Sequence, residues 1–390
     1  MVLRISSNIF YTSLYFVQIG FPHSMKQYFS FQWHITDDCD QRCKHCYIFA
    51  ENMRKKLVSM SYDDMMTVLD KCEEFCNKFN RIPYFYITGG DPILHKHFWE
   101  LLAVLKDRNY PFTIMGNPFH LTDRVCEQLK NYGCQKYQMS IDGCESTHDW
   151  FRKKGSYKTT LEKVSMLNKA GIRSVIMTTV SGINIQEVPQ IIDAVVKAGV
   201  NVYAFSRYCP TSTNKALKSD PSYIEPMEYR KLLEICDRKF KEYEKQGCET
   251  YFNRKDHLWT LYEYEIGEFI IPANTEKDMI YGGCNCGNCH ITITPAGDVY
   301  ACRRVQNSKV GNLYETSLVE LWLSELEKYR DFSFFKKCSK CELMPWCRGC
   351  PAVASGISGD FYAPDPQCWK EIPEDISTKF TNQSIRVRVV

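Results

Sequence analysis

The sequence predicts an α/β fold in which six strand–helix units are followed by a cysteine-rich module. Short apolar runs alternate with longer amphipathic segments from Gln27 onward, and each strand-like run is followed by a helix-like one. After about Gln246 that alternation stops, and Cys, Gly and Pro crowd the chain. A chain of 390 residues with 44% hydrophobic residues is long enough for two or three domains with a sizeable core.

The alternating part gives six strands and six helices. The expected strands are Tyr28–Ile35, Tyr84–Thr88, Phe112–Met115, Lys136–Ile141, Ser174–Val180 and Val202–Ser206. The expected helices are Tyr62–Phe79, His97–Arg108, Asp123–Tyr132, Tyr157–Ala170, Gln186–Ala198 and Met227–Lys245. Thr122 is an N-cap candidate, while Gly171 and Gly199 mark helix ends. Strands in this order form a parallel sheet, which is either an open doubly wound sheet or an incomplete barrel.

These patterns divide the chain into five segments. We expect an N-terminal extension at residues 1–27, a βα domain at 28–246, a bridging region at 247–283, the cysteine-rich module at 284–375 and a tail at 376–390. The apolar stretch 8–21 is shorter than the about 18 residues of a membrane helix and lacks a signal-peptidase site. A net charge of +3 favours no nucleic-acid partner. We therefore expect a cytoplasmic protein that binds neither membrane nor nucleic acid.

Three cysteines follow the first strand at short spacing, as Cys39-x3-Cys43-x2-Cys46. Three thiolates on one loop can hold one face of a cubane iron–sulfur cluster, and the missing fourth thiolate leaves one iron open to another ligand. Zinc is the alternative, and it would need a fourth ligand such as His34 or His45. The spacing therefore indicates a metal loop with an open coordination position.

This loop resembles the signature of the radical S-adenosylmethionine (SAM) superfamily, Cx3CxΦC, with His45 at the usually aromatic position. The resemblance implies a partial (β/α)6 barrel with a [4Fe–4S] cluster on Cys39, Cys43 and Cys46. It also implies that SAM chelates the open iron and is cleaved to a 5′-deoxyadenosyl radical. The cofactors supply that chemistry, and the protein supplies geometry and excludes water.

Two further segments resemble SAM-binding motifs of the superfamily. Gly89-Gly90-Asp91-Pro92 follows the second strand and is similar to the GGEP motif that binds the SAM amino group, with Asp91 in place of Glu. After the fourth strand, Ser140, Asp142 and Arg152 lie in a segment similar to SxDG…HDxxR. Hydroxyl and carboxylate groups suit ribose, and an arginine suits a carboxylate. Arg152 alone would equally be a solvated surface charge.

The module contains nine cysteines within 85 residues, more than expected by chance. They are Cys284, Cys286, Cys289, Cys302, Cys338, Cys341, Cys347, Cys350 and Cys368. Disulfides or a pair of zinc ribbons are alternatives, but a reducing compartment favours metal. The other eight cysteines are expected to be buried thiols; they are Cys72, Cys76, Cys126, Cys134, Cys144, Cys209, Cys236 and Cys248.

The module resembles the SPASM extension of radical SAM peptide-modifying enzymes, which holds auxiliary iron–sulfur clusters. The resemblance assigns auxiliary cluster I to two of Cys284, Cys286 and Cys289, with Cys302 and Cys350. It assigns auxiliary cluster II to Cys338, Cys341, Cys347 and Cys368. Two residues separate Cys347 from Cys350 where the family has three, and nine cysteines compete for eight positions. Three [4Fe–4S] clusters are therefore expected, with the ligands of cluster I least defined.

The resemblance implies modification of a ribosomally made precursor peptide, and the segment from Gln32 to Cys46 is similar to maturases of CXXX-repeat targets that form cysteine thioethers. Oxidation of Ser or Cys to formylglycine and carbon–carbon crosslinking are alternatives among enzymes. An iron–sulfur electron carrier and a zinc scaffold are the non-enzymatic alternatives. The expected partners are the peptide, a separate leader-recognition protein, and a ferredoxin or flavodoxin. His34, Asp37, Asp38 and Tyr47 flank the cluster, but none stands out as catalytic acid or base.

Overall fold

The structure, a computed structural model, describes residues 27–49, 56–211, 220–275 and 279–373, and these contain one ten-stranded sheet. Its strand order is β10-β9-β8-β1-β2-β3-β4-β5-β6-β7. The strands are β1 (Gln27–Thr36), β2 (Arg81–Gly89), β3 (Phe112–Met115), β4 (Lys136–Ser140), β5 (Arg173–Val180), β6 (Val202–Arg207), β7 (Tyr251–Asn253), β8 (His290–Ile293), β9 (Asp298–Tyr300) and β10 (Lys309–Asn312). Strands β1 to β7 pair in parallel, as the repeated strand–helix pattern predicts.

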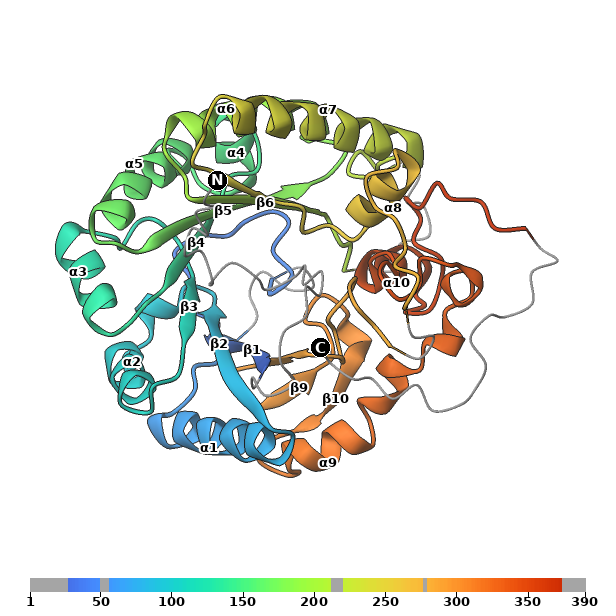
Figure 1. Ribbon diagram of the computed structural model, residues 1–390. Coiled ribbons are helices and arrows are strands. Elements are labelled where there is room, and N and C mark those ends of the chain that lie inside the picture. The colour runs from blue at the N-terminus through green and yellow to red at the C-terminus, as the bar shows by residue number, and fades with distance from the viewer. Residues whose placement is uncertain (1–26, 50–55, 212–219, 276–278, 374–390) are drawn as a thin grey trace, which may run out of the picture.

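Helices cover the outer face of this curved sheet, as Figure 1 shows. The α-helices of the described residues are α1 (Tyr62–Lys78), α2 (Phe98–Asp107), α3 (Asp123–Asn131), α4 (Glu145–Phe151), α5 (Ser156–Lys169), α6 (Val188–Lys197), α7 (Pro226–Lys245), α8 (Leu258–Glu265), α9 (Leu318–Leu323) and α10 (Pro351–Ser358), the last of which lies in the C-terminal region. The arrangement is a partial α/β barrel, and its C-terminal cysteine-rich domain extends the sheet past β1 and also packs on the segment after β6.

Alternation along β1 explains how one strand serves both the core and the interior. Phe29, Phe31 and Trp33 are buried, and the Phe29 ring packs on Phe75 of α1 at 4.7 Å between centroids. Neighbouring side chains on a strand point to opposite faces, so Gln32 and His34 face the barrel interior. The side chains on the outer face of β1 therefore pack into the hydrophobic core under the helices, whereas those on its inner face can be polar.

All six predicted strands and six predicted helices are present, with ends that differ by a few residues. Thr122 Oγ1 accepts a hydrogen bond from the Val125 amide, which confirms the predicted N-cap. Gly171 and Gly199 adopt φ of 73° and 70° directly after their helices, as a left-handed C-terminal position requires. The patterns missed the short elements α4, α8 and β7, because three to eight residues carry little periodicity.

The C-terminal region continues the barrel sheet. Strand β8 pairs in parallel with β1, from Ser30 opposite His290 to Trp33 opposite Ile293. Strands β9 and β10 then extend the sheet in antiparallel order. At the other edge, β7 pairs with β6, so the parallel sheet runs a few residues past 246. The division of the chain at residues 27, 246, 283 and 375 remains a proposal.

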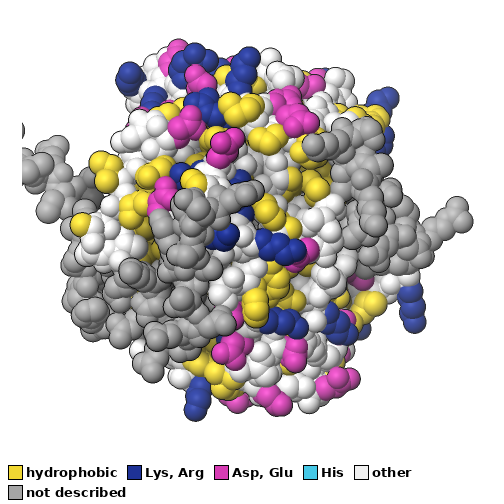
Figure 2. All heavy atoms as spheres, turned by 90° about the vertical axis from the view of Figure 1, so that its right-hand side faces the viewer, with side chains coloured by type: hydrophobic (Ala, Val, Ile, Leu, Met, Phe, Trp, Pro, Cys, Tyr) yellow, Lys and Arg dark blue, Asp and Glu magenta, His cyan; other side chains and the backbone are white. Residues whose placement is uncertain are grey.

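The surface carries charges of both signs. Figure 2 shows basic and acidic side chains interspersed on the face where α8 and α10 lie. Within the described ranges, no helix combines the length and the apolar character needed to cross a membrane.

Candidate functional site

The loop after β1 brings three thiols together. Cys39, Cys43 and Cys46 are half-buried, and none of the three forms a disulfide. Burial raises the pKa of each thiol, and their mutual repulsion adds to the shift. Asn117 Nδ2 donates to Cys39 Sγ over 3.3 Å, and Arg152 Nη1 lies 3.8 Å from Cys43 Sγ. Donors directed at the sulfurs stabilise thiolates, so the loop fits a cluster held by three cysteines.

The Gly89-Gly90 turn after β2 fixes the position of this loop. The Gly90 amide donates to the Thr36 carbonyl over 2.8 Å, and the Asp91 amide donates to the Asp38 carbonyl over 2.6 Å. A Cβ atom at position 90 would lie 2.1 Å from the Asp38 oxygen. The glycines are therefore required by close approach of the cysteine loop's own backbone, a contact that the sequence pattern did not reveal.

Asp91 presents an unpaired carboxylate beside the cysteine loop. Its side chain is fully buried, and among the described residues no charged side chain forms an ion pair with it. Burial raises the pKa of Asp91 to about 7, although the Asn117 and Ile93 amides oppose the shift. A buried carboxyl group without an ion-pair partner suits a cationic group, so Asp91 fits the ammonium of SAM. Pro92 follows as the first residue of a short 3-10 helix.

Asp142 is occupied by groups of the chain itself. Its buried carboxylate accepts from Arg152 Nε over 2.5 Å and from the Thr179 amide over 2.8 Å, and it lies 3.2 Å from His45 Nε2. Burial alone would raise the pKa of Asp142, but Arg152 and His45 hold it well below the usual range. Asp142 therefore orients Arg152 towards Cys43 and contacts the cysteine loop itself through His45. The predicted ribose contacts of Asp142 and of half-buried Ser140 remain predictions.

The C-terminal cysteines form two groups. Cys338, Cys341, Cys347 and Cys368 interact electrostatically with one another. These are the four residues predicted for auxiliary cluster II, and the structure brings them together.

The second group surrounds Cys302. The Cys286 thiol hydrogen-bonds both Cys284 and Cys302. Cys350 adjoins the same group through its electrostatic interaction with Cys284. Cys289 also interacts with Cys284, but its other charged neighbours are Arg81 and Arg348. The structure therefore favours Cys284 and Cys286 over Cys289 as neighbours of Cys302.

Sequence reasoning missed Cys209, which was grouped with the ordinary buried thiols. It is 6% exposed, as expected, but its sulfur lies against Cys350 and accepts from Arg304 Nη1 over 3.4 Å. The Cys350 contact lowers the pKa of Cys209, and Arg304 helps to bring it to about 6 despite burial. The position of Cys209 directly after the predicted sixth strand could have indicated a site residue, because the carboxyl ends of parallel strands lie at one edge of the sheet.

Arg303 and Arg304 connect the two cysteine regions. The Arg303 guanidinium lies 5.6 Å from the ring centroid of Tyr47, which directly follows Cys46. Arg304, the next residue, contacts Cys209 in the second thiol group. Gln32 Nε2 donates to the Tyr47 hydroxyl over 3.3 Å from the inner face of β1. The cysteine loop and the second thiol group therefore face the same interior space.

The interior also holds a lysine that the sequence did not single out. Lys255 Nζ lies 4.0 Å from Met177 Sδ, and it follows β7 at the open end of the sheet. Burial lowers the pKa of Lys255 to about 8, and Arg304 adds to the shift. Lys255, Arg303 and Arg304 thus give this space a cationic character.

Comparisons with known proteins agree with this geometry. The model of the radical SAM superfamily matches residues 33–195, and that of the SPASM iron–sulfur cluster-binding domain matches residues 284–351. The AdoMet-dependent heme synthase of Nitratidesulfovibrio vulgaris is 27% identical over 345 residues, covering 86% of this chain and 90% of the relative. The mycofactocin maturase MftC of Mycolicibacterium smegmatis is 22% identical, covering 86% and 81%.

A solved structure shows the same fold. Streptococcus suis SuiB bound to the precursor peptide SuiA superposes with a TM-score of 0.69 at 17% identity, over 89% of this chain and 77% of SuiB. At that identity the likeness concerns the fold.

Proposed function

This chain is a radical SAM enzyme with a C-terminal SPASM domain, and on that premise we propose that it modifies a ribosomally made precursor peptide. The proposed reaction joins a cysteine sulfur of the peptide to the carbon of another residue in a thioether. The chain's similarity to the maturase MftC supports a maturation reaction. SuiB, which shares the fold, binds a precursor peptide.

The observation that carries the proposal is the shared interior between the cysteine loop and the second thiol group. Arg303 packs over Tyr47 beside Cys46, and the adjacent Arg304 contacts Cys209. A peptide in this space would meet the radical-generating loop on one side and a thiol-rich centre on the other. Sulfur-to-carbon bond formation needs both a hydrogen-abstracting group and an electron acceptor near one substrate.

The chain's own residues bind and orient the reactants. Cys39, Cys43 and Cys46 would hold the first cluster, Asp91 would hold the SAM ammonium, and Arg152, aligned by Asp142, would hold its carboxylate. When bound, SAM and the clusters supply a 5′-deoxyadenosyl radical and electron-accepting centres. The peptide loses one hydrogen atom, one proton and one electron for each thioether. Two auxiliary clusters, a leader-recognition protein and a ferredoxin or flavodoxin reductant belong to this proposal.

Modification of a tetrapyrrole is the second candidate. Relatives named heme synthases align over 86% of this chain. Lys255, Arg303 and Arg304 place three cations around the interior, and cations suit the carboxylates of a tetrapyrrole. The same cations suit acidic residues of a peptide, so the substrate must be tested directly.

The first experiment measures iron, sulfide and SAM cleavage on anaerobically reconstituted protein. We expect about twelve irons per chain, falling to about eight in the Cys39/Cys43/Cys46→Ala variant, with 5′-deoxyadenosine formation lost. Zinc in place of iron, or unchanged cleavage in the variant, contradicts the assignment. Cys126→Ala is the control, because Cys126 is a buried thiol of α3 and is expected to leave iron and cleavage unchanged.

The second experiment identifies the substrate. The chain is co-expressed with cysteine-rich peptides encoded beside its gene, and in parallel the purified enzyme is given iron-coproporphyrin III. A peptide that loses two hydrogens per crosslink, with its cysteine blocked to alkylation, supports the thioether. Formylglycine in the peptide, or a carbon–carbon crosslink with a free thiol, would contradict the thioether and support that other peptide modification. Conversion of the porphyrin alone would support the tetrapyrrole candidate.

A further inference from the structure

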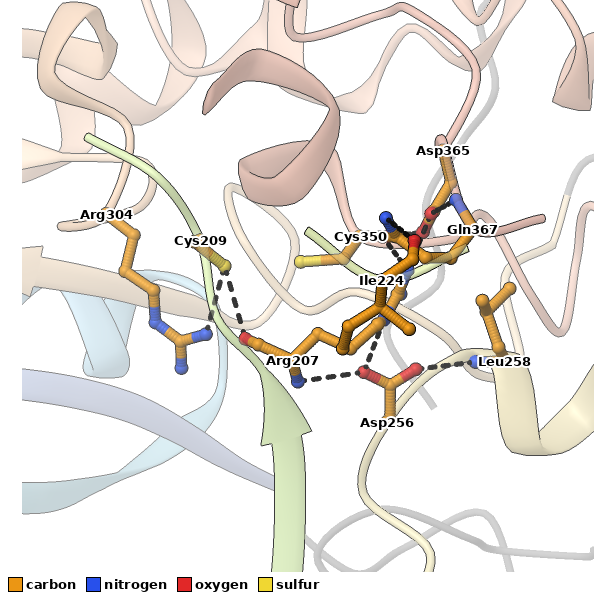
Figure 3. A network of polar contacts seen from close by, with 9 residues as sticks. All are labelled: Arg207, Cys209, Ile224, Asp256, Leu258, Arg304, Cys350, Asp365 and Gln367. Atoms are coloured by element: carbon orange, nitrogen blue, oxygen red, sulfur yellow. Dashed lines mark hydrogen bonds and ion pairs between the residues drawn. The ribbon is translucent and has the colours of Figure 1, made fainter. Parts of the chain in front are cut away.

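Cys209 lies two residues after the end of β6, and Figure 3 shows its sulfur beside that of Cys350, a member of the second thiol group. Its sulfur accepts from Arg304 Nη1 over 3.4 Å and lies beside the Cys350 thiol. As a thiol, Cys209 donates to the Arg207 carbonyl over 3.7 Å, and the Arg304 guanidinium beside the sulfur favours loss of that proton. A thiolate is the form of cysteine that binds iron.

A buried polar network holds Cys209 and Cys350 in place. Arg207, the last residue of β6, donates from Nη1 to Asp365 Oδ1 over 2.6 Å and from Nε to Asp256 Oδ2 over 3.0 Å. Asp365 Oδ2 also accepts from the Cys350 amide over 2.7 Å. Arg207 therefore fixes β6, which leads to Cys209, and Asp365 fixes Cys350 against it (Figure 3).

Close backbone packing tightens the same contact. A Cβ atom at Gly356 of α10 would lie 2.1 Å from the Pro210 carbonyl oxygen. Pro210 follows Cys209 directly, and α10 begins directly after Cys350. The absence of a side chain at position 356 thus lets the two cysteine-bearing segments approach each other.

Arg304 provides charge compensation for this centre. Besides its contact with Cys209, its guanidinium interacts electrostatically with Cys302 and Cys350. A cluster bound by four thiolates is anionic, and a buried anion needs a partner of opposite charge. Arg304 interacts with the sulfurs of Cys209, Cys302 and Cys350, and therefore can provide the positive charge that a buried anionic cluster needs.

We propose that Cys209 is a ligand of auxiliary cluster I, together with Cys302, Cys350 and one of the neighbouring pair Cys284 and Cys286. The assignment rests on the proposed presence of that cluster. Five thiols compete for four positions here, and Cys209 comes from the barrel rather than from the SPASM domain. The cluster would then bond the barrel covalently, through iron, to the C-terminal region.

The test uses the chain with Cys39, Cys43 and Cys46 replaced by Ala, in which iron belongs to the auxiliary clusters. Cys209→Ser is added to this background, with Cys350→Ser as the reference for ligand loss and Cys236→Ser, a fully buried thiol of α7, as the control. Iron content, the electron paramagnetic resonance spectrum of the reduced clusters and their midpoint potentials are measured. We expect Cys209→Ser to alter the spectrum and potential of one cluster as Cys350→Ser does, and Cys236→Ser to alter neither.

A Cys209→Ser spectrum and iron content equal to those of Cys236→Ser would overturn the assignment while leaving the auxiliary clusters in place. Background protein without auxiliary iron would overturn the proposed clusters and this assignment together. If Cys209→Ser gives no soluble protein, a crystal structure of the unchanged holoenzyme decides. An iron atom bonded to Cys209 Sγ supports the proposal, and a cluster bound by four other sulfurs contradicts it.

Discussion

Arg152 and Asp142 form a short ion pair beside the cysteine loop, with Arg152 Nε 2.5 Å from Asp142 Oδ2. The other end of the guanidinium lies 3.8 Å from Cys43 Sγ. One side chain therefore links the loop after β4 to the loop after β1. The carboxylate is fully buried and the arginine side chain is 15% exposed, which makes the pair sensitive to removal of either charge.

Asp142→Asn is expected to destabilise the protein by about 3 kcal/mol, because it leaves Arg152 buried without its counter-charge. SAM cleavage should fall as well, because Arg152 and His45 lose their common partner. Denaturant unfolding of the cluster-free protein measures the first effect, and 5′-deoxyadenosine formation measures the second. A loss of less than 1 kcal/mol would show that the pair contributes little.

Gly90→Ala is expected to remove about four irons per chain, because the added Cβ would collide with the Asp38 carbonyl and displace the cysteine loop. Gly199→Ala is the matched control. Gly199 has φ of 70° and open space around it, so alanine there costs about 1 kcal/mol of backbone strain without touching the loop. Equal iron in the two variants would contradict the role given to the glycine turn.

Asp91→Asn is expected to weaken SAM binding about tenfold, because a neutral amide replaces the carboxylate that fits the SAM ammonium. The free energy of unfolding should not fall, since the lost charge is buried and unpaired. Equilibrium dialysis against SAM measures the affinity. Unchanged affinity would place the ammonium elsewhere.

Arg207→Met is expected to cost about 3–5 kcal/mol, because Asp256 and Asp365 would remain buried without their common cation. Arg230→Met is the control, since Arg230 pairs with the partly exposed Glu265 on the surface and should cost less than about 1 kcal/mol. Thermal unfolding of both variants gives the comparison. Similar losses would contradict the idea that burial makes the Arg207 network important.

The local patterns of the sequence determined the barrel elements and both cysteine groupings. Apolar alternation is a property of neighbouring residues, so β1 to β6 and their helices could be predicted within a few residues. Local spacing also predicted two groups of cysteines, the triplet Cys39, Cys43 and Cys46 and the four cysteines Cys338, Cys341, Cys347 and Cys368. Short spacings and family motifs can be recognised directly in a sequence.

Only the tertiary structure decided which distant groups meet. Cys209 joins Cys350, and Asp142 pairs with His45, because parallel strands bring their carboxyl ends to one edge and α10 packs on the segment after β6. Such contacts depend on how the elements pack, and no short-range pattern encodes them. The sequence thus specified the thiols available for metal, whereas packing determined which thiols, cations and carboxylates share a site.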